Sequence, residues 1–406
     1  MKGNGFKQTD VGLISSDWHV STLGCITDKK RPISYGIVQT GPYVPNGIRC
    51  LRVIDIHDGV IQKGNLITTS QGISDAYRRT VLTLGDLVTP LRGNVGEVAQ
   101  VDGDLVGANL TRGVALIAVN ANVSSSYCKQ YISSPATRRR LLQAMNGSAL
   151  QEIPIGTLRS FKVALPPTKA EQEAIARALS DADALIESLE RLLAKKRLIK
   201  QGAMQELLTG KKRLPRFSGK WEKKRLGEIC MIKMGRTPPR LNPAYWGQGY
   251  MWLSIADMKS KVVTTSKEEI TALAATDMEV IRKGTLMMSF KLSIGRLCFA
   301  GCDLYTNEAI CSFNDLRADA RFLYHILGRT DFSLYGKQAV KGYTLNSESL
   351  NLVEVLLPLP EEQAAIAEIF DDLDLEVDAI ESQLAKARQI KQGMMQELLT
   401  GRIRLI

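Results

Sequence analysis

The chain has 406 residues, a formal net charge of +11 at pH 7 and a hydrophobic fraction of 44%, so it is long enough for several domains with buried cores. It contains no apolar run that could span a bilayer and no apolar stretch behind its first lysine, which predicts a cytoplasmic protein without a membrane helix or secretory signal. The excess of Lys and Arg indicates a polyanionic partner such as nucleic acid, although many basic proteins bind none.

Short strands beside turns are expected throughout residues 1–165, which we predict to form a first mixed α/β domain. Arg and Lys can bind guanine and phosphate, Asn can read adenine, and Gly lets the backbone approach DNA closely. On these grounds the candidates for nucleic-acid contact are Tyr77, Arg78, Arg79, Arg92, Asn94 and Arg112. For any one of them, a solvated surface turn is an equally good interpretation.

The periodicity of apolar residues predicts a long helix within residues 166–213. The apolar positions, in steps of four and three, are Ile175, Leu179, Ala182, Ile186, Leu189 and Leu193. Such spacing is typical of a coiled-coil seam. Pro166 and Pro167 can precede the helix without interrupting it, and Gly210 is placed to end it. A helix of about 38 residues would be roughly 55–60 Å long.

A second mixed α/β domain is predicted over residues 214–357. It opens with a polar, basic stretch, residues 214–224. The candidates for nucleic-acid contact in this domain are Lys291, Ser293, Arg296, Lys341 and Tyr343. As in the first domain, a solvated turn explains each single residue equally well.

Residues 358–406 repeat the first helix. The segments 171–214 and 362–405 align without a gap, and roughly 25 of about 44 positions are identical. The second seam consists of Ile366, Phe370, Leu373, Val377, Ile380 and Leu384. Because the seams match in length and phase, we predict that residues 171–208 and 362–399 pack antiparallel as a coiled coil. The alternative is a core-facing helix in each domain.

Together these elements predict an α+β protein with a pseudo-two-fold internal repeat, in which two long antiparallel helices separate two mixed α/β domains. Trp18 to Gly24 parallels Trp221 to Gly227, and Leu51 to Asp55 parallels Leu253 to Asp257. The loops between these segments differ in length and content. The two domains are therefore expected to share a framework and to differ in what they display.

Some helix positions are not explained by the seam. Gly202 and Gly393 stand at the same place inside the two helices, where glycine costs about 1 kcal/mol relative to alanine. We interpret them as sites of close helix packing, with a bend as the alternative. Leu185, Leu192 and Leu198 would stay exposed on a two-helix coil, so we expect a partner protein to cover part of that surface.

No residue pattern indicates a catalytic or metal centre. Thr237 to Arg240 (TPPR) lacks the polar and aromatic residues that flank the paired prolines of an adenine methyltransferase, and no Walker-type phosphate loop is present. Only Cys298 and Cys302 lie close together among seven cysteines, which predicts reduced cysteines packed in cores. Three separated histidines are interpreted as surface or hydrogen-bonded core residues rather than ligands: His19, His57 and His325.

The order of domain, long helix, domain, long helix resembles the specificity subunits of Type I restriction–modification enzymes, over nearly the whole chain. The most specific motifs, each present in both helices, are Glu171-Gln172, Lys200-Gln201-Gly202 and Gln205 to Gly210. The stretch Ile48 to Asp55 also resembles the opening of a target-recognition domain. One region departs from the repeat, because little of the polar linker before Trp221 is found before Trp18.

The resemblance implies that residues 1–165 and 214–357 are target-recognition domains, each reading one half of a bipartite site in double-stranded DNA. The helices would set the spacing and dock two methyltransferase subunits, and motor-nuclease restriction subunits would join for cleavage. The chain itself would be non-catalytic, with S-adenosylmethionine, ATP and Mg bound by partner subunits. Alternatives are the specificity subunit of a related methyltransferase/nuclease system without a separate motor subunit, a fused enzyme, or a coiled-coil scaffold that binds no DNA.

Overall fold

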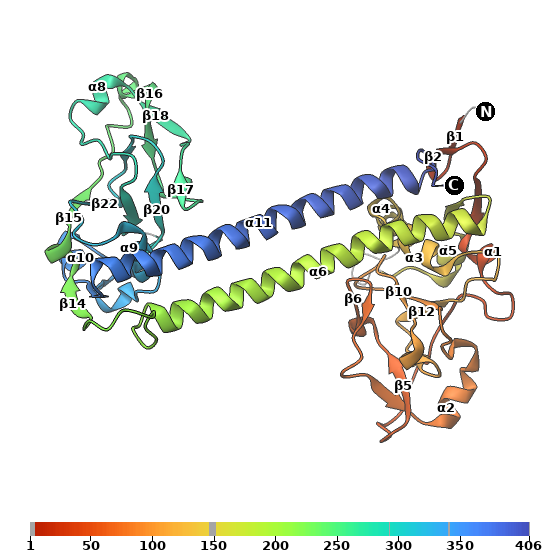
Figure 1. The fold of residues 1–406 in the computed structure, drawn as a ribbon. Helices are drawn as coiled ribbons and strands as arrows, with labels where there is room; N and C mark the ends of the chain where they lie inside the picture. The colour runs from red at the N-terminus through yellow and green to blue at the C-terminus, as the bar shows by residue number, and fades with distance from the viewer. Residues whose placement is uncertain (1–4, 146–151, 292, 340–341, 406) are drawn as a thin grey trace. The chain divides into compact units, whose positions relative to one another are not determined.

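The computed structural model describes residues 5–145, 152–291, 293–339 and 342–405, with residues 337–339 and 342–344 described by their backbone alone. It divides into two compact units. The first consists of Met1–Glu190 together with Ser382–Ile406, and the second of Arg191–Glu381. Each long helix therefore begins in one unit and ends in the other (Figure 1).

Short strands and helices make up the body of the first unit. Its strands are β1 (Phe6–Thr9), β2 (Gly12–Ser15), β3 (His19–Thr22), β4 (Ser34–Tyr35), β5 (Ile48–Leu51), β6 (Ile56–His57), β7 (Val60–Ile61), β8 (Ile67–Thr69), β9 (Leu87–Pro90), β10 (Ala99–Gln100), β11 (Asn109–Leu110), β12 (Val114–Ile117) and β13 (Lys162–Leu165). Its short helices are α1 (Leu23–Ile26), α2 (Gln71–Ala76), α3 (Ser125–Ser133), α4 (Pro135–Gln143) and α5 (Ile155–Ser160). Single 3₁₀ turns are formed by Val53–Asp55, Arg78–Thr80 and Gly103–Leu105.

The second unit contains a similar set of elements. Its strands are β14 (Glu222–Arg225), β15 (Met231–Met234), β16 (Trp246–Leu253), β17 (Val262–Val263), β18 (Glu268–Ile270), β19 (Leu286–Ser289), β20 (Leu297–Ala300), β21 (Tyr305–Thr306), β22 (Ile310–Asn314), β23 (Lys337–Ala339), β24 (Gly342–Thr344) and β25 (Glu354–Leu357). Its short helices are α7 (Leu226–Ile229), α8 (Ala272–Ala275), α9 (Ala320–Leu327) and α10 (Ser347–Asn351), and its 3₁₀ turns are Pro243–Tyr245, Ile255–Asp257 and Phe332–Leu334.

The two units share one sheet topology. The order β10-β9-β12-β4 in the first unit corresponds to β20-β19-β22-β15 in the second, where β17 adds a further edge strand. The order β11-β5-β8 corresponds to β21-β16-β18, and in both sheets the first two strands run parallel. The pairs β13-β3 and β25-β14 also correspond. The segment parallels read from the sequence therefore fall on equivalent elements, as the predicted internal repeat requires.

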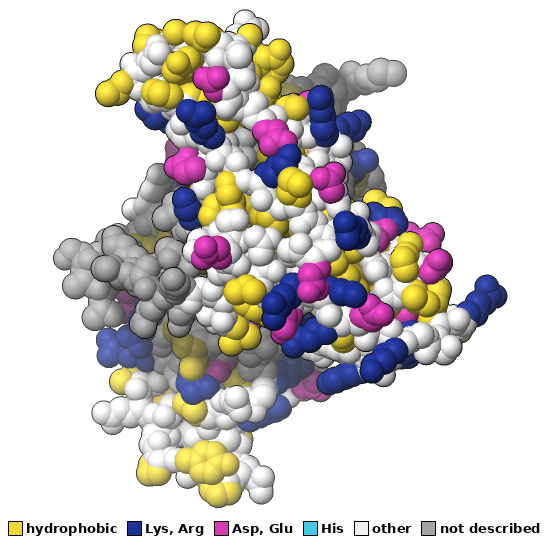
Figure 2. All heavy atoms as spheres, turned by 90° about the vertical axis from the view of Figure 1, so that its left-hand side faces the viewer, with side chains coloured by type: hydrophobic (Ala, Val, Ile, Leu, Met, Phe, Trp, Pro, Cys, Tyr) yellow, Lys and Arg dark blue, Asp and Glu magenta, His cyan; other side chains and the backbone are white. Residues whose placement is uncertain are grey.

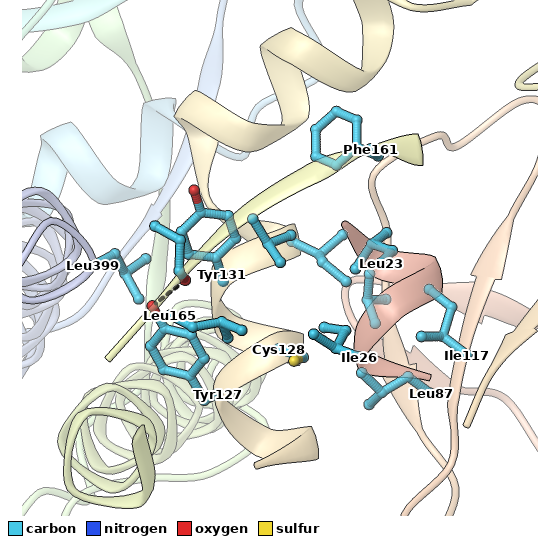
Figure 3. Close-up of a cluster of buried hydrophobic side chains, with 14 of the residues drawn as sticks. Leu23, Ile26, Leu87, Ile117, Tyr127, Cys128, Tyr131, Phe161, Leu165 and Leu399 are labelled. Carbon is cyan, nitrogen blue, oxygen red and sulfur yellow. Dashed lines mark hydrogen bonds between the residues drawn. The ribbon is translucent and has the colours of Figure 1, made fainter. Parts of the chain in front are cut away.

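The core of the first unit joins its strands to both long helices. Figure 3 shows Tyr127 and Tyr131 of α3 packed beside Leu165 of β13 and Leu399, which directly follows α11. The Tyr127 hydroxyl donates a hydrogen bond to the Ala164 carbonyl at 2.9 Å, which satisfies a polar group that is otherwise fully buried. Burial of each such large side chain stabilises the fold by about 1.5–3 kcal/mol.

The long helices α6 (Lys169–Leu207) and α11 (Pro360–Leu398) have 39 residues each. Ion pairs show that they run antiparallel within both units, because later residues of α6 meet earlier residues of α11. The pairs are Asp183 with Lys391 and Glu190 with Arg388 in the first unit, and Lys200 with Asp374 and Arg197 with Glu381 in the second. The antiparallel pairing predicted from the two seams is confirmed. Among the described residues, no helix combines the length and the apolarity that a bilayer crossing needs.

The seam residues have two kinds of surroundings. Ile175 and Leu179 lie in the core of the first unit, and Ile366 and Phe370 lie in the core of the second. Farther along the helices, Leu193, Ile380 and Leu384 are buried, whereas Ile186, Leu189 and Val377 are half-buried. Each helix therefore buries the N-terminal part of its seam in the core of a domain, together with C-terminal residues of the other long helix.

The close-packing interpretation of the helix glycines is wrong. A Cβ atom added to Gly202 or to Gly393 would meet no atom within 4 Å, apart from the helix's own backbone. Leu185, Leu192 and Leu198 are exposed, as expected for positions off the seam. Both glycine positions therefore have room for a methyl group in the chain itself.

The Glu-Gln motif closes the first unit at the start of α6. Glu171, only 1% exposed, accepts hydrogen bonds from the Nε and Nη2 atoms of Arg404, which lies beyond the end of α11. Arg404 also binds Asp17 at 2.9 Å. Gln172 accepts a hydrogen bond from the backbone N–H of Ser124 at 2.9 Å, at the N-terminus of α3. We call the Glu171–Arg404 pair the first closing pair.

The same arrangement recurs in the second unit. Glu362, also 1% exposed, accepts from Nε of Arg213 at 2.7 Å and from Nη2 at 2.6 Å. Arg213 donates in addition to the carbonyl of Gly219 at 2.7 Å. Gln363 accepts from the backbone N–H of Asp319 at 2.9 Å, at the N-terminus of α9. We call the Glu362–Arg213 pair the second closing pair.

The departure from the repeat at the N-terminus is explained by the C-terminal tail. Gly210, at φ +68°, lies against Trp221, and Gly401, at φ +73°, lies against Trp18. The backbone N–H of Ser15 donates to the Thr400 carbonyl at 2.9 Å, so the end of α11 packs beside β2 in the first unit (Figure 1). Residues that follow α11 thus pack against Trp18 in the same way that residues that follow α6 pack against Trp221.

Two expectations about single residues need correction. Cys25 is exposed and Cys302 half-buried, so only the other cysteines are packed in cores. His325 is buried, but its Nε2 atom has no hydrogen-bond partner among the described residues, so it is not the satisfied core histidine that we expected. Within the described part of the chain, His325 lacks a partner because the nearby carboxylates of Asp371 and Asp374 are paired with lysines.

Candidate nucleic-acid interface

A broad hollow of about 1040 Å³ opens on the surface of the first domain, and arginines line it. Arg92 lies two residues after the end of β9, on a turn in which Gly93 adopts φ +70°. Arg112 lies between β11 and β12. The Arg92 side chain lies over Gly113, where an added Cβ would come within 3.4 Å of its Nε atom. Backbone turns thus bring Arg92 and Arg112, both predicted candidates, to one surface.

The arginines of this hollow differ in what they bind. Arg52 is held by Asp55, with contacts of 3.0 and 2.8 Å, and donates to the Asn65 carbonyl. Arg92 and Arg112 are exposed, and neither guanidinium has a hydrogen-bond or ion-pair partner within the described ranges. Arg52 is therefore a structural residue, whereas Arg92 and Arg112 can bind an external anion or base edge.

The remaining candidates of the first domain lie elsewhere. Asn94 is exposed on the same turn as Arg92 but does not line the hollow. Tyr77 ends α2 and is half-buried, while Arg78 and Arg79 are exposed on the 3₁₀ turn that follows. Their position suits contact with phosphate or solvent more than joint action with Arg92.

The second domain presents a different set of side chains at the matching place. The backbone N–H of Phe290 donates to Ala309 at 3.0 Å, just as that of Leu91 donates to Gly113 at 2.8 Å. By this register Lys291 occupies the place of Arg92. The residue that occupies the place of Arg112 is Glu308, so the same framework position carries opposite charge in the two domains.

Glu308 is fixed as an ionised carboxylate. Thr237 donates a hydrogen bond to its Oε2 atom, and this bond, together with the backbone and the nearby charges of Lys291 and Arg240, lowers the pKa of Glu308. Arg240 itself is occupied, because its guanidinium lies 4.1 Å from the ring centre of Trp246 and 4.7 Å from that of Trp252 and pairs with Glu268 at 2.6 Å. Arg240 therefore stabilises the loop rather than presenting an open guanidinium.

The other candidates of the second domain divide into described and undescribed residues. Ser293 accepts a hydrogen bond from the Ser289 hydroxyl through its carbonyl and shapes the turn after β19. Arg296 is exposed on that turn. Tyr343 belongs to β24, but its side chain lies outside the described residues, as does the whole of Lys341.

Charges of both signs are mixed on the face of the second unit that Figure 2 presents. Figure 2 shows Lys and Arg side chains interspersed with Asp and Glu, and hydrophobic side chains gathered at the upper end, where α8 and β16 lie. Leu241, Tyr250 and Leu273 are among the exposed hydrophobic residues of this region. This face therefore presents no uniform phosphate-binding patch among its described residues.

One cluster of possible metal ligands lies at the base of the second domain. Ligand atoms of His325, Asp371 and Asp374 lie within 4.8 Å of one another. Lys261 is 2.8 Å from a carboxylate oxygen of each aspartate, and Lys200 also pairs with Asp374. Burial and the charge of Lys261 lower the pKa of His325 to about 4. Because the ammonium groups already neutralise both carboxylates, we interpret the cluster as an ion-pair network.

Comparison with known proteins identifies the family. A family model described as the Type I restriction modification DNA specificity domain matches residues 28–195 and 218–390. The chain belongs to this family. The two matched segments each combine one domain with most of one long helix, as the internal repeat predicts.

Relatives in the Type I specificity family cover the chain to different extents. The putative MjaX specificity subunit of Methanocaldococcus jannaschii is 24% identical over 100% of this chain and 98% of its own length. The EcoBI specificity subunit of Escherichia coli is 29% identical over 180 residues, which are 44% of this chain and 38% of that relative. The crystal structure of a Type I S subunit from M. genitalium has the same fold, with a TM-score of 0.61 and 15% identity over 98% of this chain and 97% of the other.

Within a Type I specificity subunit, some site residues escaped sequence reasoning. Thr237 and Arg240 belong to the loop that the sequence predicts to be ordinary, and Glu308 is not among the predicted candidates. Its position in the internal repeat, equivalent to that of Arg112, is the feature from which Glu308 could have been predicted. The domain comparison therefore adds Glu308 to the candidate interface, with Thr237 as the residue that orients it.

Proposed function

We propose that each domain of this Type I specificity subunit reads one half of a bipartite site in double-stranded DNA. The observation that carries the proposal is the repeated framework with unlike side chains at matched positions. Equal backbones would dock on DNA in equal ways, while Arg92 and Arg112 in one domain and Lys291 and Glu308 in the other would contact different bases. A single framework then yields two independent specificities.

The paired helices are proposed to set the spacing between the half-sites and to dock two methyltransferase subunits. Each helix of 39 residues is about 58 Å long at a rise of 1.5 Å per residue. Leu185, Leu192 and Leu198 leave apolar surface uncovered along α6, which supports a protein partner there. These leucines are not repeated on α11, but Ile199 and Ile390 are exposed at equivalent positions of the two helices, and this pair supports one docking surface for each methyltransferase.

The chain is proposed to supply recognition and no chemistry. S-adenosylmethionine, ATP and Mg would be bound by the methyltransferase and motor-nuclease subunits. The sequence supports this division of labour because it contains neither a methyltransferase catalytic loop nor a Walker-type phosphate loop. Methyl transfer by the purified chain alone would contradict this part of the proposal.

Mapping of methylated adenines in cells with an exchanged domain tests the proposal. Residues 12–165 are replaced by the matching domain of another specificity subunit. One half of the methylated site should change, while the half read by the second domain and the spacing should persist. A change in both halves, or in neither, would show that the domains do not read DNA independently.

A further inference from the structure

The position held by Arg112 in the first domain and by Glu308 in the second is the sharpest difference between the two interfaces. The register around it is the same in both domains. In each domain the residue before this position donates its backbone N–H to the carbonyl at the end of an equivalent strand. Thr111 donates to Leu51 of β5 at 2.9 Å, and Asn307 donates to Leu253 of β16 at 3.0 Å. The backbone at this position is therefore equivalent in the two domains, whereas the side chains carry opposite charges.

In the first domain this position offers donors. Arg112 is exposed, lines the hollow together with Arg92, and has no side-chain partner in the part of the chain that the structure describes. A guanidinium can donate two parallel hydrogen bonds, and guanine is the base that presents two acceptors, O6 and N7, in the major groove. The chemistry of this position thus matches guanine.

In the second domain the position offers acceptors. Thr237 binds one carboxylate oxygen of Glu308 and so orients the group, while the exposed side chain still presents its other oxygen. A carboxylate repels phosphate, so on a DNA-binding face it is useful only where it meets a base donor. Cytosine presents such a donor, its N4 amino group, in the major groove.

We propose that this shared framework position reads a base in both domains, with Arg112 binding guanine in one half-site and Glu308 binding the amino group of cytosine in the other. The inference rests on the proposed function, in which each domain reads one half-site. Lys291 and Arg240 flank Glu308 and offset its repulsion of the DNA backbone.

Selection from DNA duplexes with both half-sites randomised tests the proposal. The full chain, assembled with the methyltransferase subunits of its system, is compared with Glu308→Gln, Arg112→Ala and the control Glu279→Gln. Glu279 is also an exposed glutamate of the second domain, but it pairs with Lys233. Thermal unfolding of each variant shows that the fold is retained, which is expected because both test residues are exposed.

Glu308→Gln should relax the preference for cytosine at one position of one half-site by about 5- to 150-fold, the range that a good base contact contributes. Arg112→Ala should reduce the preference for guanine at one position of the other half-site by a similar factor. Glu279→Gln should leave both preferences unchanged. If both test variants leave the selected sequences unchanged, or weaken binding evenly across sequences, the inference is overturned. Should the unmodified assembly select no split sequence at all, the proposed function itself fails.

Discussion

The two units share the contacts that join the long helices to the domains, but they differ in the side chains that they present at equivalent positions. Both bury a glutamate at the start of a long helix and bind it with an arginine that follows the other long helix. At the candidate interface, however, Arg112 is replaced by Glu308, and within α3 and α9 the buried Gln130 is replaced by the buried His325. The shared closing contacts lie where the long helices enter the domains. The differences lie on an exposed turn, at Arg112 and Glu308, and also in a buried contact between a domain helix and a long helix, at Gln130 and His325.

This distribution shows which contacts the repeat must keep. A buried carboxylate without a partner destabilises a protein severely, so the closing pairs cannot vary one residue at a time. An exposed side chain on a turn carries no such constraint. The same framework can therefore display new recognition chemistry without a cost to the fold.

The largest effect is expected from breaking a closing pair. Arg213→Ala would leave Glu362 buried and unpaired, and Arg404→Ala would do the same to Glu171 while also removing a partner of Asp17. Each substitution should lower the free energy of unfolding of its own unit by about 3–5 kcal/mol. The effect of Arg404→Ala should be the larger of the two, because Asp17 also loses its partner. Hydrogen exchange with chemical denaturation measures the two units separately.

Glu173→Ala provides the control for this comparison. Glu173 lies on α6 beside the closing pair, but it is exposed and 4.0 Å from Lys169, a separation at which a surface pair contributes less than about 1 kcal/mol. Loss of protection in both units from either arginine variant would show that the two closing pairs do not act independently.

A smaller effect, dependent on pH, is expected from His325→Gln. The structure places Gln130 at the matching position, where its amide donates to Asp183 at 2.9 Å, whereas the buried Nε2 of His325 is unpartnered. The pKa of His325 is lowered to about 4 by burial and by Lys261 and Lys200, against the opposing charges of Asp374 and Asp371. The unfolded chain therefore binds a proton that the folded chain excludes.

The sign of the pH effect follows from this lowered pKa. Above the ordinary histidine pKa of 6.5 the folded unit keeps its full stability, and between 6.5 and about 4 it loses stability as the pH falls. The total loss is up to about 3 kcal/mol. His325→Gln should remove this slope from denaturation curves measured between pH 7 and 4, and the exposed-residue control His19→Gln should retain it. An unchanged slope in His325→Gln would contradict the assignment.

Periodic features of the structure were predictable from the sequence. The predicted helix segments, residues 171–208 and 362–399, differ from the observed α6 and α11 by no more than two residues at each end. The seam spacing repeats over many turns, so local errors average out. The matched segments around Trp18 and Trp221 were also found correctly, because large buried residues and turns leave a clear pattern.

Contacts between distant residues could not be predicted in the same way. Glu308 is oriented by Thr237, which lies 71 positions earlier, and Gln172 accepts a hydrogen bond from Ser124, which lies 48 positions before it. Neither partner is marked by any periodicity. The isolation of His325 depends on Lys261 having already bound both aspartates, which is a property of the folded cluster rather than of any segment.

The smallest effect is expected at the two helix glycines. An alanine methyl at Gly202 or Gly393 would meet no atom within 4 Å of the chain itself, apart from the helix's own backbone. Alanine restricts the unfolded chain more than glycine does and favours the helix, so each Gly→Ala variant should stabilise the isolated chain by about 0.5–1 kcal/mol. Denaturation of the free protein measures this gain, and the neighbouring exposed residue Gln201, changed to alanine, serves as the control for helix propensity.

The same variants should behave in the opposite way in the assembled enzyme. If methyltransferase subunits pack on these open helix faces, the added methyl groups would occupy space that the partner needs, and Gly202→Ala and Gly393→Ala should each weaken binding of one methyltransferase. Titration of the chain with methyltransferase distinguishes the two glycines, because loss of one site from two is visible in the stoichiometry. Variants that are more stable and yet bind both methyltransferases as before would show that the glycines lie outside the docking surfaces.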